Sequence, residues 1–338
     1  MSPTTVSRPH RDNFVRWAAN RPEVVVLSAD LTASCEADGF REAYPERFFS
    51  LGMAEQNMLG FAGGLAREGF FPFVHSFAVF LTRRPFDQLA MSIAYPNLPV
   101  RLLGFLPGIT TPGGVTHQAI EDLALMRALP NLTVLECGDA TEVESVLDVA
   151  QQRPGPAYVR MLRGAVPRLF PAAEPLQLDR ARVLSRGSDV ALISSGICTG
   201  EVLRASRALA GRGISVAHLH VSTLKPFTDP RIEETVAAVR AGVVTCENHN
   251  VIGGLGSAVA ERIATAGLGR PLLRLGLQDT FAHGASAGYL MRAYGLDARA
   301  VVQAVERLLG EPLAVDDDEL AATEISAAAA TAAKPEDL

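Results

Sequence analysis

The chain has 338 residues, of which 48% are hydrophobic and 20% charged, which is enough for two ordinary α/β domains with cores of their own. It carries 31 Lys and Arg against 37 Asp and Glu, a net charge of −6, without a dense basic run interleaved with aromatics, and this argues against nucleic-acid binding. Its four cysteines form no C-x-x-C pair, so they indicate neither a zinc site nor a disulfide framework and fit a reducing cytoplasm.

The N-terminal residues 1–9 contain no apolar run typical of a signal peptide, and we expect them to be flexible. No later apolar stretch approaches the roughly 18 residues that span a bilayer. We therefore predict a cytoplasmic protein that does not insert into a membrane.

Residues 10–165 alternate between short β-branched runs and helical patterns. The runs at 24–27 and 99–103 have strand character, whereas 54–65 and 119–129 have helical periodicity. Such alternation predicts a largely parallel sheet flanked by helices. We expect a first α/β domain here.

A carboxylate stands at the start of one of these helices, in FFSLGMAEQNMLGFAGGLA at 48–66. Most other positions of the helix are apolar or small, so Glu55 is hard to explain as part of a solvated face. Burial among Met53, Met58, Leu59 and Phe61 would favour a protonated, hydrogen-bonding acid. A first-turn acid stabilised by the helix dipole is the alternative, and this segment leaves both open.

Aromatic residues gather in the next segment, PFVHSFAVFLTRRPFDQL at 72–89. Phe77 and Phe80 are three positions apart and are flanked by Phe73 and Phe86, in a chain with only 6% aromatics. A planar heterocycle could stack there. An aromatic core cluster gives the same spacing and is favoured by spacing alone.

The pattern changes after residue 165. Three prolines between 167 and 175 indicate a linker over 166–184. Strand-like runs at 190–193, 215–220 and 242–245 predict a second, smaller α/β domain over 185–310. The segment 311–338 is acidic, rich in Ala and without large apolar residues at core spacing, which predicts a disordered tail.

Two features of the second domain have simple explanations. GGLGSA at 253–258 lacks the spacing of a dinucleotide-binding loop and predicts a glycine-rich turn that enters a helix. His218 and His220 lie two apart on a strand and face one side, but without a third ligand nearby a metal site is not favoured.

A third segment, GGVTHQAIEDLALMRALPNLTV at 113–134, completes a specific combination. Together with the two segments above, it resembles the pyrimidine-binding domain of the transketolase family. CENHNVIGGLGSAVAERIA and LGLQDTFAHGASAGYLMRAYGLD resemble the C-terminal domain of that family, so the resemblance covers about residues 10–310. Deoxyxylulose phosphate synthases and β chains of 2-oxoacid dehydrogenase E1 share the architecture, but IEDLALMRALPN is nearer to transketolase.

The resemblance implies a thiamine diphosphate enzyme that transfers a two-carbon ketol unit from a ketose phosphate to an aldose phosphate. It assigns to Glu55 the hydrogen bond to N1′ of the aminopyrimidine that activates the cofactor. Phe77 and Phe80 would line or stack on this ring, and Asp30 would lie near it.

The resemblance also implies a substrate side. His117 would contact substrate oxygens or shuttle a proton, and Ser34 would lie at the substrate mouth. Arg163 falls where the family places an arginine for the acceptor phosphate. Arg11 matches a second such arginine only loosely, and we interpret it as a surface side chain. His249 and His283 lie in family-like loops and are left out of the site.

One family feature has no counterpart in this sequence: the G-D-G motif, with its downstream Asn, that binds Mg²⁺ and diphosphate. The resemblance therefore implies a separately encoded N-terminal subunit that supplies the Mg²⁺ ligands in an α₂β₂ assembly.

Three positions depart from the family pattern. Phe105 replaces a His and Gly113 an Asp that normally contact substrate, and Arg83 stands at the position of a third aromatic. We therefore expect a more apolar mouth and a non-standard sugar. An E1 β-type subunit, a deoxyxylulose-type synthase subunit and a non-catalytic relative remain alternatives.

Overall fold

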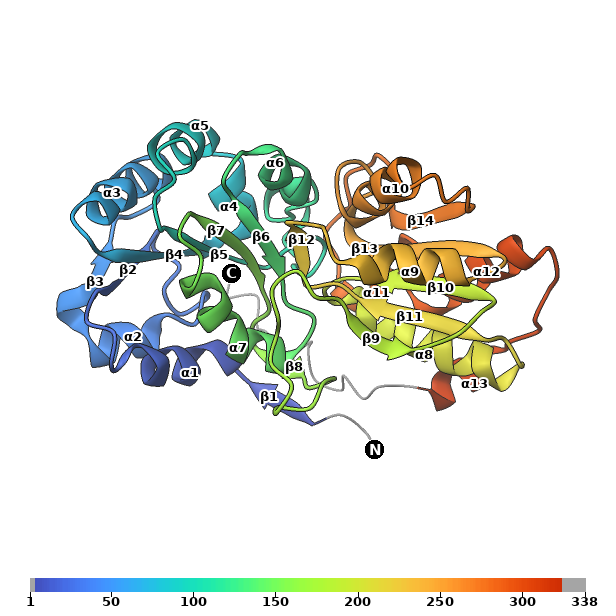
Figure 1. Cartoon of the computed structure of the whole chain (residues 1–338). Coiled ribbons are helices and arrows are strands. Elements are labelled where there is room, and N and C mark those ends of the chain that lie inside the picture. The colour runs from blue at the N-terminus through green and yellow to red at the C-terminus, as the bar shows by residue number, and fades with distance from the viewer. Residues whose placement is uncertain (1–3, 324–338) are drawn as a thin grey trace.

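The chain forms two α/β lobes that lie side by side, as Figure 1 shows for a computed structural model that describes residues 4–323. Within these residues, a first lobe contains a seven-stranded sheet and a second lobe a five-stranded sheet. Both sheets are largely parallel and flanked by helices, so the predicted fold class is confirmed.

The sheet of the first lobe owes its stability to strands that are buried on both faces. All five residues of β2 are buried, and its β-branched side chains alternate between two hydrophobic clusters, as the pleat of a strand requires. Only β12 runs antiparallel to its neighbour in this sheet. In sheet order the strands are β12 (Thr223–Lys225), β6 (Thr133–Glu136), β7 (Ala157–Met161), β5 (Arg101–Phe105), β4 (Phe71–Phe77), β2 (Val24–Ser28) and β3 (Phe48–Ser50).

Helices cover both faces of this sheet. Phe14 of α1 and Val143 of α7 pack on one face, whereas Met58 of α3 and Leu123 of α6 pack on the other. The helices and helical turns are α1 (Pro9–Ala18), α2 (Asp38–Ala43), η1 (Pro45–Arg47), α3 (Glu55–Arg67), α4 (Ala78–Thr82), α5 (Phe86–Gln88), η2 (Leu89–Ala94), η3 (Gly114–Thr116), α6 (Asp122–Ala128) and α7 (Ala140–Gln151).

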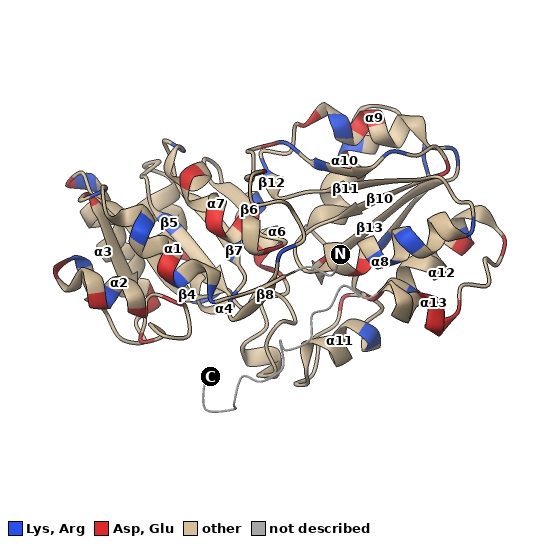
Figure 2. Cartoon of the chain, turned by 90° about the horizontal axis from the view of Figure 1, so that it is seen from below, with Lys and Arg blue, Asp and Glu red and all other residues tan. Residues whose placement is uncertain are grey.

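The second lobe repeats this plan on a smaller scale. Its sheet order is β14 (Leu272–Leu277), β13 (Gly242–Asn250), β10 (Val190–Ser194), β11 (Val216–His220) and β9 (Arg182–Ser185), with β9 antiparallel. Its helices are α8 (Cys198–Gly211), α9 (Pro230–Ala238), α10 (Leu255–Thr265), α11 (Ala287–Ala293), α12 (Ala298–Leu309) and α13 (Asp317–Ala322). Lys and Arg are interspersed with Asp and Glu over the helices of both lobes (Figure 2).

The two lobes share structure and core. Strand β12 belongs to the second lobe by sequence, yet it pairs with β6 and completes the sheet of the first. One hydrophobic cluster also runs through both lobes, from Leu59 of α3 and Met126 of α6 to Ile193 of β10 and Val259 of α10. The lobes therefore form one packed unit rather than two domains that are joined by a linker alone.

The predicted flexible N-terminus and disordered tail are wrong where the structure describes them. β1 (Thr5–Ser7) pairs with β8 (Ala165–Pro167), so this part of 1–9 is held by strand pairing. Asp316 caps α13 through a complete capping box, and Val315 and Leu320 are buried against the second lobe. These two apolar residues are enough to anchor a helix. Residues 1–3 and 324–338 lie outside the described residues.

The glycine-rich turn is confirmed, because GGLGSA leads into α10 with Gly254 at its N-cap. Backbone N–H groups of Leu255 and Gly256 donate to the Glu247 carboxylate at 2.6 and 2.8 Å. His218 and His220 do face one side of β11. His218 bonds to Ser194 and His220 to Thr199 and Glu142, so both are hydrogen-bonded core side chains.

Candidate active site

The predicted site residues follow the carboxyl ends of neighbouring strands in the first lobe. Asp30 comes after β2, Glu55 after β3 and Phe77 at the end of β4, and these three strands are hydrogen-bonded neighbours. Parallel strands bring their carboxyl ends to one edge of the sheet, where α/β folds bind ligands. This edge is therefore the candidate active site.

Glu55 is the first residue of α3, and its side chain is only 3% exposed. Its Oε1 accepts a hydrogen bond of 2.7 Å from Nη1 of Arg84. Met58 and Leu59 are buried as expected, but Met53 and Phe61 are 81% and 40% exposed. The expected apolar surroundings of Glu55 are thus confirmed for Met58 and Leu59 and wrong for Met53 and Phe61. Met53 precedes the helix, and Phe61 lies on its outer face.

An aromatic cluster lies next to Glu55. The rings of Phe77 and Phe80 stack with centroids 5.8 Å apart, and the His117 ring meets both edge-on at 6.2 and 5.4 Å. Arg84 places its guanidinium carbon 4.0 Å from the centre of the Phe80 ring. The structure therefore joins Glu55, Phe77, Phe80 and His117 in one site through Arg84, a residue that the sequence analysis missed.

His117 sits in a loop that needs glycine at position 113. A Cβ on Gly113 would lie 2.9 Å from Cγ of the His117 ring, so any side chain there would push the ring away. Thr116 Oγ1 and His117 Nδ1 are 2.8 Å apart. The absence of a side chain at 113 is thus explained by the position of His117.

Arg83 holds this same loop in place. Its guanidinium donates to the carbonyls of Val115 and Gln118 at 3.2 and 3.1 Å and pairs with Glu121. The hydrogen bond to Glu121 raises the pKa of Arg83, so the guanidinium stays charged. The arginine at the expected position of a third aromatic is therefore part of the support of His117.

Two arginines approach the loop after β2. Arg163 donates to the carbonyl of Ser34 at 3.1 Å, and Arg8 donates to the carbonyl of Ala33 at 3.5 Å. Arg8 and Arg11 both pair with Asp38, and Arg11 also pairs with Asp12 and Glu42, which fits its interpretation as a surface side chain. Arg8 is thus a second arginine at this loop, and its sequence signal is its place next to Pro9 at the start of α1.

Asp30 lies at the same edge in an unusual backbone conformation. Its φ is 63°, in the left-handed region that Asp tolerates better than most residues, and its side chain is exposed. It directly follows the buried residues Ser28 and Ala29. The turn therefore directs Asp30 out of the core.

The expected apolar mouth is wrong at Phe105. Its side chain is fully buried, with the ring 6.0 Å from the His75 ring and 5.5 Å from the His10 ring. Burial lowers the pKa of His75 to about 4, so this neutral ring packs as an aromatic. The reason is that β5 is an inner strand whose residues are all buried.

The second lobe contacts the loop that leads to His117. Asn248 of β13 bonds to the backbone of Pro107 and Ile109, where this loop begins. Arg160 donates to the carbonyls of Asn248 and Ala119 and pairs with Asp122. Burial opposes ionisation of Asp122, but the Arg160 charge outweighs it and lowers the pKa of the carboxyl.

Two histidines of the second lobe lie near this loop without a place among the site residues. His249 is fully buried, 4.0 Å from Asp122. The backbone carbonyl of His283 accepts a hydrogen bond of 3.3 Å from Gln118. Both therefore belong to the contact between the lobes.

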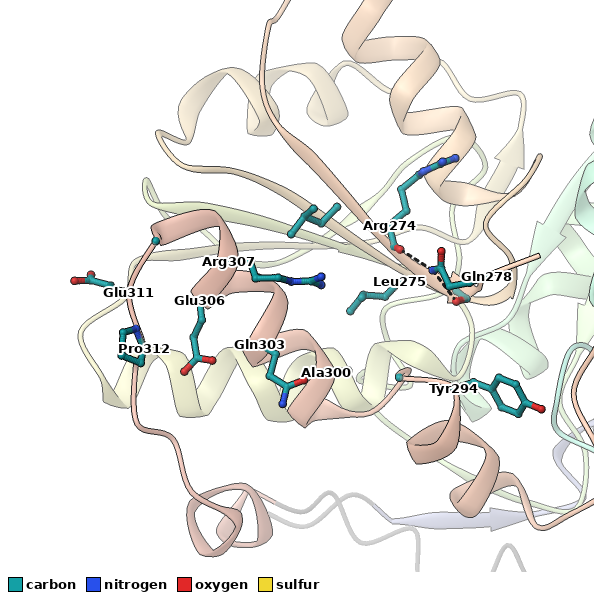
Figure 3. A pocket seen from close by; sticks show the side chains of 14 residues that line it. Arg274, Leu275, Gln278, Tyr294, Ala300, Gln303, Glu306, Arg307, Glu311 and Pro312 are labelled. Carbon is teal, nitrogen blue, oxygen red and sulfur yellow. Dashed lines mark hydrogen bonds between the residues drawn. The ribbon is translucent and has the colours of Figure 1, made fainter. Parts of the chain in front are cut away.

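A pocket of about 890 Å³ lies elsewhere, between β14 and α12 of the second lobe (Figure 3). Arg274, Gln278, Tyr294 and Arg307 are among the residues that line it, and none of the predicted site residues does.

Across residues 4–323, the structure contains no helix with the length and apolar composition of a membrane span. Over the same range, no group of three or more His, Cys, Asp or Glu is placed to hold a metal ion.

Comparisons with known proteins agree with this architecture. Residues 5–168 match the model of the transketolase pyrimidine binding domain, and residues 179–301 match that of the transketolase C-terminal domain. A 6-deoxy-6-sulfo-D-fructose transketolase subunit from Clostridium sp. (strain MSTE9) is 38% identical over 88% of this chain and 92% of its own. A putative transketolase C-terminal section from Methanocaldococcus jannaschii is 38% identical over 87% and 93%.

A solved structure described as a split gene transketolase, in an inactive β4 tetramer, is also similar. It has a TM-score of 0.81 and 39% identity, and the match covers 89% of this chain and 97% of that one.

Proposed function

Because the chain belongs to the transketolase family, we propose that it is the pyrimidine-binding subunit of a split thiamine diphosphate-dependent transketolase. It transfers a two-carbon ketol unit from a ketose to an aldose. The observation that carries this proposal is the buried carboxyl of Glu55 beside the stacked rings of Phe77 and Phe80.

These residues fit the aminopyrimidine ring of the cofactor. The aminopyrimidine can stack on an aromatic face and accept a hydrogen bond from a carboxyl group at its edge. Phe80 and Glu55 supply these two groups, and they lie close enough for the single guanidinium of Arg84 to contact both. Thiamine diphosphate, when bound, supplies the electron sink for cleavage of the ketose carbon–carbon bond. Glu55 holds a proton at N1′ of the ring, and Asp30 lies at the edge of the same site.

The substrate side comprises His117, Ser34 and Arg163. His117 presents its ring next to Phe80 and exchanges protons with substrate hydroxyls. Arg163, with Arg8, approaches the Ala33–Ser34 backbone, and guanidinium groups suit the anionic group of a sugar phosphate. Arg8 is also paired with Asp38, so the support for an anion site rests on Arg163.

The diphosphate group and Mg²⁺ are held by a separately encoded subunit in an α₂β₂ assembly. Next to Glu55, α3 presents a flat outer face with Gly60 and Gly64, where a Cβ would meet nothing within 4 Å. Phe61 of α3 and Met53 just before it lie exposed, as do Met91 of the neighbouring η2 and Tyr95 just after it. Exposed apolar groups of this kind mark protein interfaces. The split transketolase described as inactive in its β4 form supports the need for a second subunit.

The sugar is a non-standard one. Phe105 no longer supports this proposal, because it is buried in the core. Support comes instead from the Clostridium relative, whose name specifies a sulfonated sugar. Sulfonate and phosphate are both anions that a guanidinium binds, so Arg163 is compatible with either group.

The test is reconstitution with a diphosphate-binding transketolase subunit. We expect tight thiamine diphosphate binding and ketol transfer only in the complex, and Glu55→Gln should abolish transfer while the complex still assembles. Glu234→Gln, an exposed carboxyl on α9, is the matched control. Ketol transfer by the isolated chain, or full transfer by the Glu55→Gln complex, would refute the proposal.

The sugar is tested separately in the same complex, by a screen of ketose donors with phosphate, sulfonate or neutral ends. Efficient use of xylulose 5-phosphate and ribose 5-phosphate would contradict the non-standard sugar.

A further inference from the structure

Arg84 makes two contacts at the centre of the candidate site. It lies in the turn between α4 and α5, and its Nη1 donates to Glu55 Oε1 at 2.7 Å. Its guanidinium carbon lies 4.0 Å from the centre of the Phe80 ring. Gln56 holds the backbone of this turn by donating to the Arg84 carbonyl at 3.2 Å.

These contacts are the same two that the proposed function requires of the aminopyrimidine. A guanidinium is a planar, delocalised group that stacks on aromatic rings and donates to carboxylates from its edge. An aminopyrimidine is likewise planar, stacks on its face and bonds at its edge. One acceptor, Glu55, and one stacking partner, Phe80, cannot serve both groups at once.

We propose that Arg84 occupies the place of the aminopyrimidine in the unpartnered chain and has to leave both Glu55 and Phe80 before thiamine diphosphate binds. This inference rests on the proposed function, because that function assigns the ring to this place. Arg84 thus competes with the cofactor for Glu55 and Phe80.

The different burial of Glu55 and Arg84 explains why Arg84 can leave this place. The Glu55 side chain is 3% exposed, whereas that of Arg84 is 48% exposed. A buried carboxylate without a partner is costly, so Arg84 stabilises the ionised Glu55. Arg84 itself reaches in from the surface, and rotation outward returns its charge to water at little cost.

The neighbouring Arg83 shows the contrasting case. Arg83 is fixed by Glu121 and by two backbone carbonyls, so it cannot leave without loosening the loop. Arg84 has Glu55 as its only ion-pair partner among the described residues. Consecutive arginines in one segment thus have different tasks, one as a fixed support and one as a movable occupant.

Competition of this kind lowers the apparent cofactor affinity by the fraction of chains in which Arg84 has moved away. Arg84→Ala should therefore tighten thiamine diphosphate binding by the reconstituted complex, in the presence of Mg²⁺, about three- to tenfold in calorimetric titration. Arg84→Lys keeps the charge but loses the planar stack, so its affinity should lie between wild type and Ala. Arg207→Ala removes an exposed arginine from α8 and should leave affinity unchanged.

Unchanged or weaker binding by an Arg84→Ala complex that still assembles would overturn the inference. A wild-type complex that fails to bind thiamine diphosphate would instead refute the proposed function. The two failures are therefore distinguishable.

A second measurement needs no partner subunit. In the isolated ¹⁵N-labelled chain, the Arg84 Nε–H signal, identified by its loss in Arg84→Ala, should be shifted by the Phe80 ring. Phe80→Leu should return it toward the shift of a free arginine. A signal that already has the free-arginine shift in the wild-type chain would show that Arg84 does not occupy the site.

Discussion

Asn248 on β13 of the second lobe donates its side-chain amide to the carbonyl of Pro107 at 3.0 Å and accepts the N–H of Ile109 at 2.9 Å. It is 1% exposed, and Gly108 between these two contacts has no Cβ to block it. The loop that leads to His117 is thus fixed to the second lobe at its first residues. This gives the second lobe a task in the candidate site although it contributes none of the proposed site residues.

Asn248→Ala should lower the free energy of unfolding by about 1–3 kcal/mol, because it leaves the buried N–H of Ile109 without its acceptor and removes one of the hydrogen bonds to the Pro107 carbonyl. Denaturant unfolding of the chain measures the loss, and hydrogen exchange should become faster around residue 109. Asn57→Ala, on the exposed face of α3, should change stability by less than about 0.5 kcal/mol. Equal losses in both variants would contradict the assigned role of Asn248.

Gly113→Ala tests the position of His117. The backbone φ of Gly113 is −68°, which Ala adopts without strain, so the effect comes from the Cβ that would lie 2.9 Å from the His117 ring. We expect ketol transfer by the reconstituted complex to fall about 10- to 100-fold, since the ring is displaced from the Phe80 edge.

Gly200→Ala is the matched control. It lies within α8, where an added Cβ meets nothing within 4 Å, and should leave transfer unchanged while stabilising the helix slightly. Normal transfer by Gly113→Ala would show that the His117 ring need not occupy its observed position.

Arg83→Met removes the support of the same loop from the other side. The variant keeps an apolar stem but loses the bonds to Val115, Gln118 and Glu121. We expect kcat of the complex to fall about tenfold or more with a smaller change in KM, because the loop is loosened rather than the substrate contacts removed.

Hydrogen exchange at residues 115–118 of this variant should be faster than in wild type. The exposed Arg41 of α2 offers the comparison, and Arg41→Met should change neither kcat nor exchange. Exchange in Arg83→Met as slow as in wild type would contradict the role of Arg83 as a support of this loop.

Glu247 should give the chain a pH-dependent stability. Burial raises the pKa of Glu247 to about 7, although the N–H groups of Leu255 and Gly256 donate to it. Between the unfolded pKa near 4.3 and the folded pKa, the folded chain binds more protons than the unfolded chain. The Glu247 contribution therefore makes stability fall as pH rises through this window.

The comparison that isolates Glu247 is Glu247→Gln, measured as the free energy of unfolding at pH 5 and pH 8. Wild type should lose stability relative to Glu247→Gln between these values, since only wild type releases this proton. A constant difference between the two proteins would mean that Glu247 does not titrate in this range.

Much of the site could be predicted because it depends on local sequence and on strand ends. The local pattern singled out Glu55, Phe77 and Phe80 but left their roles open, and the family resemblance assigned them to one site. Parallel strands bring the residues after β3 and β4 to one edge. The glycine-rich turn before α10 was equally local. The roles of these residues stay predictions, whereas their proximity is a property of the structure.

The rest depends on which way side chains point across long distances in sequence. Arg84 reaches Glu55 over 29 residues, and Asn248 reaches Pro107 over 141. Phe105 was expected at the mouth because it replaces a family His that contacts substrate, but β5 is an inner strand and its last side chain is buried in the core. The acidic composition of the tail likewise hid Leu320, whose burial decides the position of α13.

Strand β12 has a consequence for how the chain is made. On the ribosome, β6 emerges some 90 residues before Thr223–Lys225, the segment that covers its open edge. Until then the nascent first lobe presents a strand with unpaired backbone groups, a template for association with other chains. A truncation after residue 168 would keep that edge permanently open, so the natural unit of synthesis, expression and crystallisation extends through both lobes.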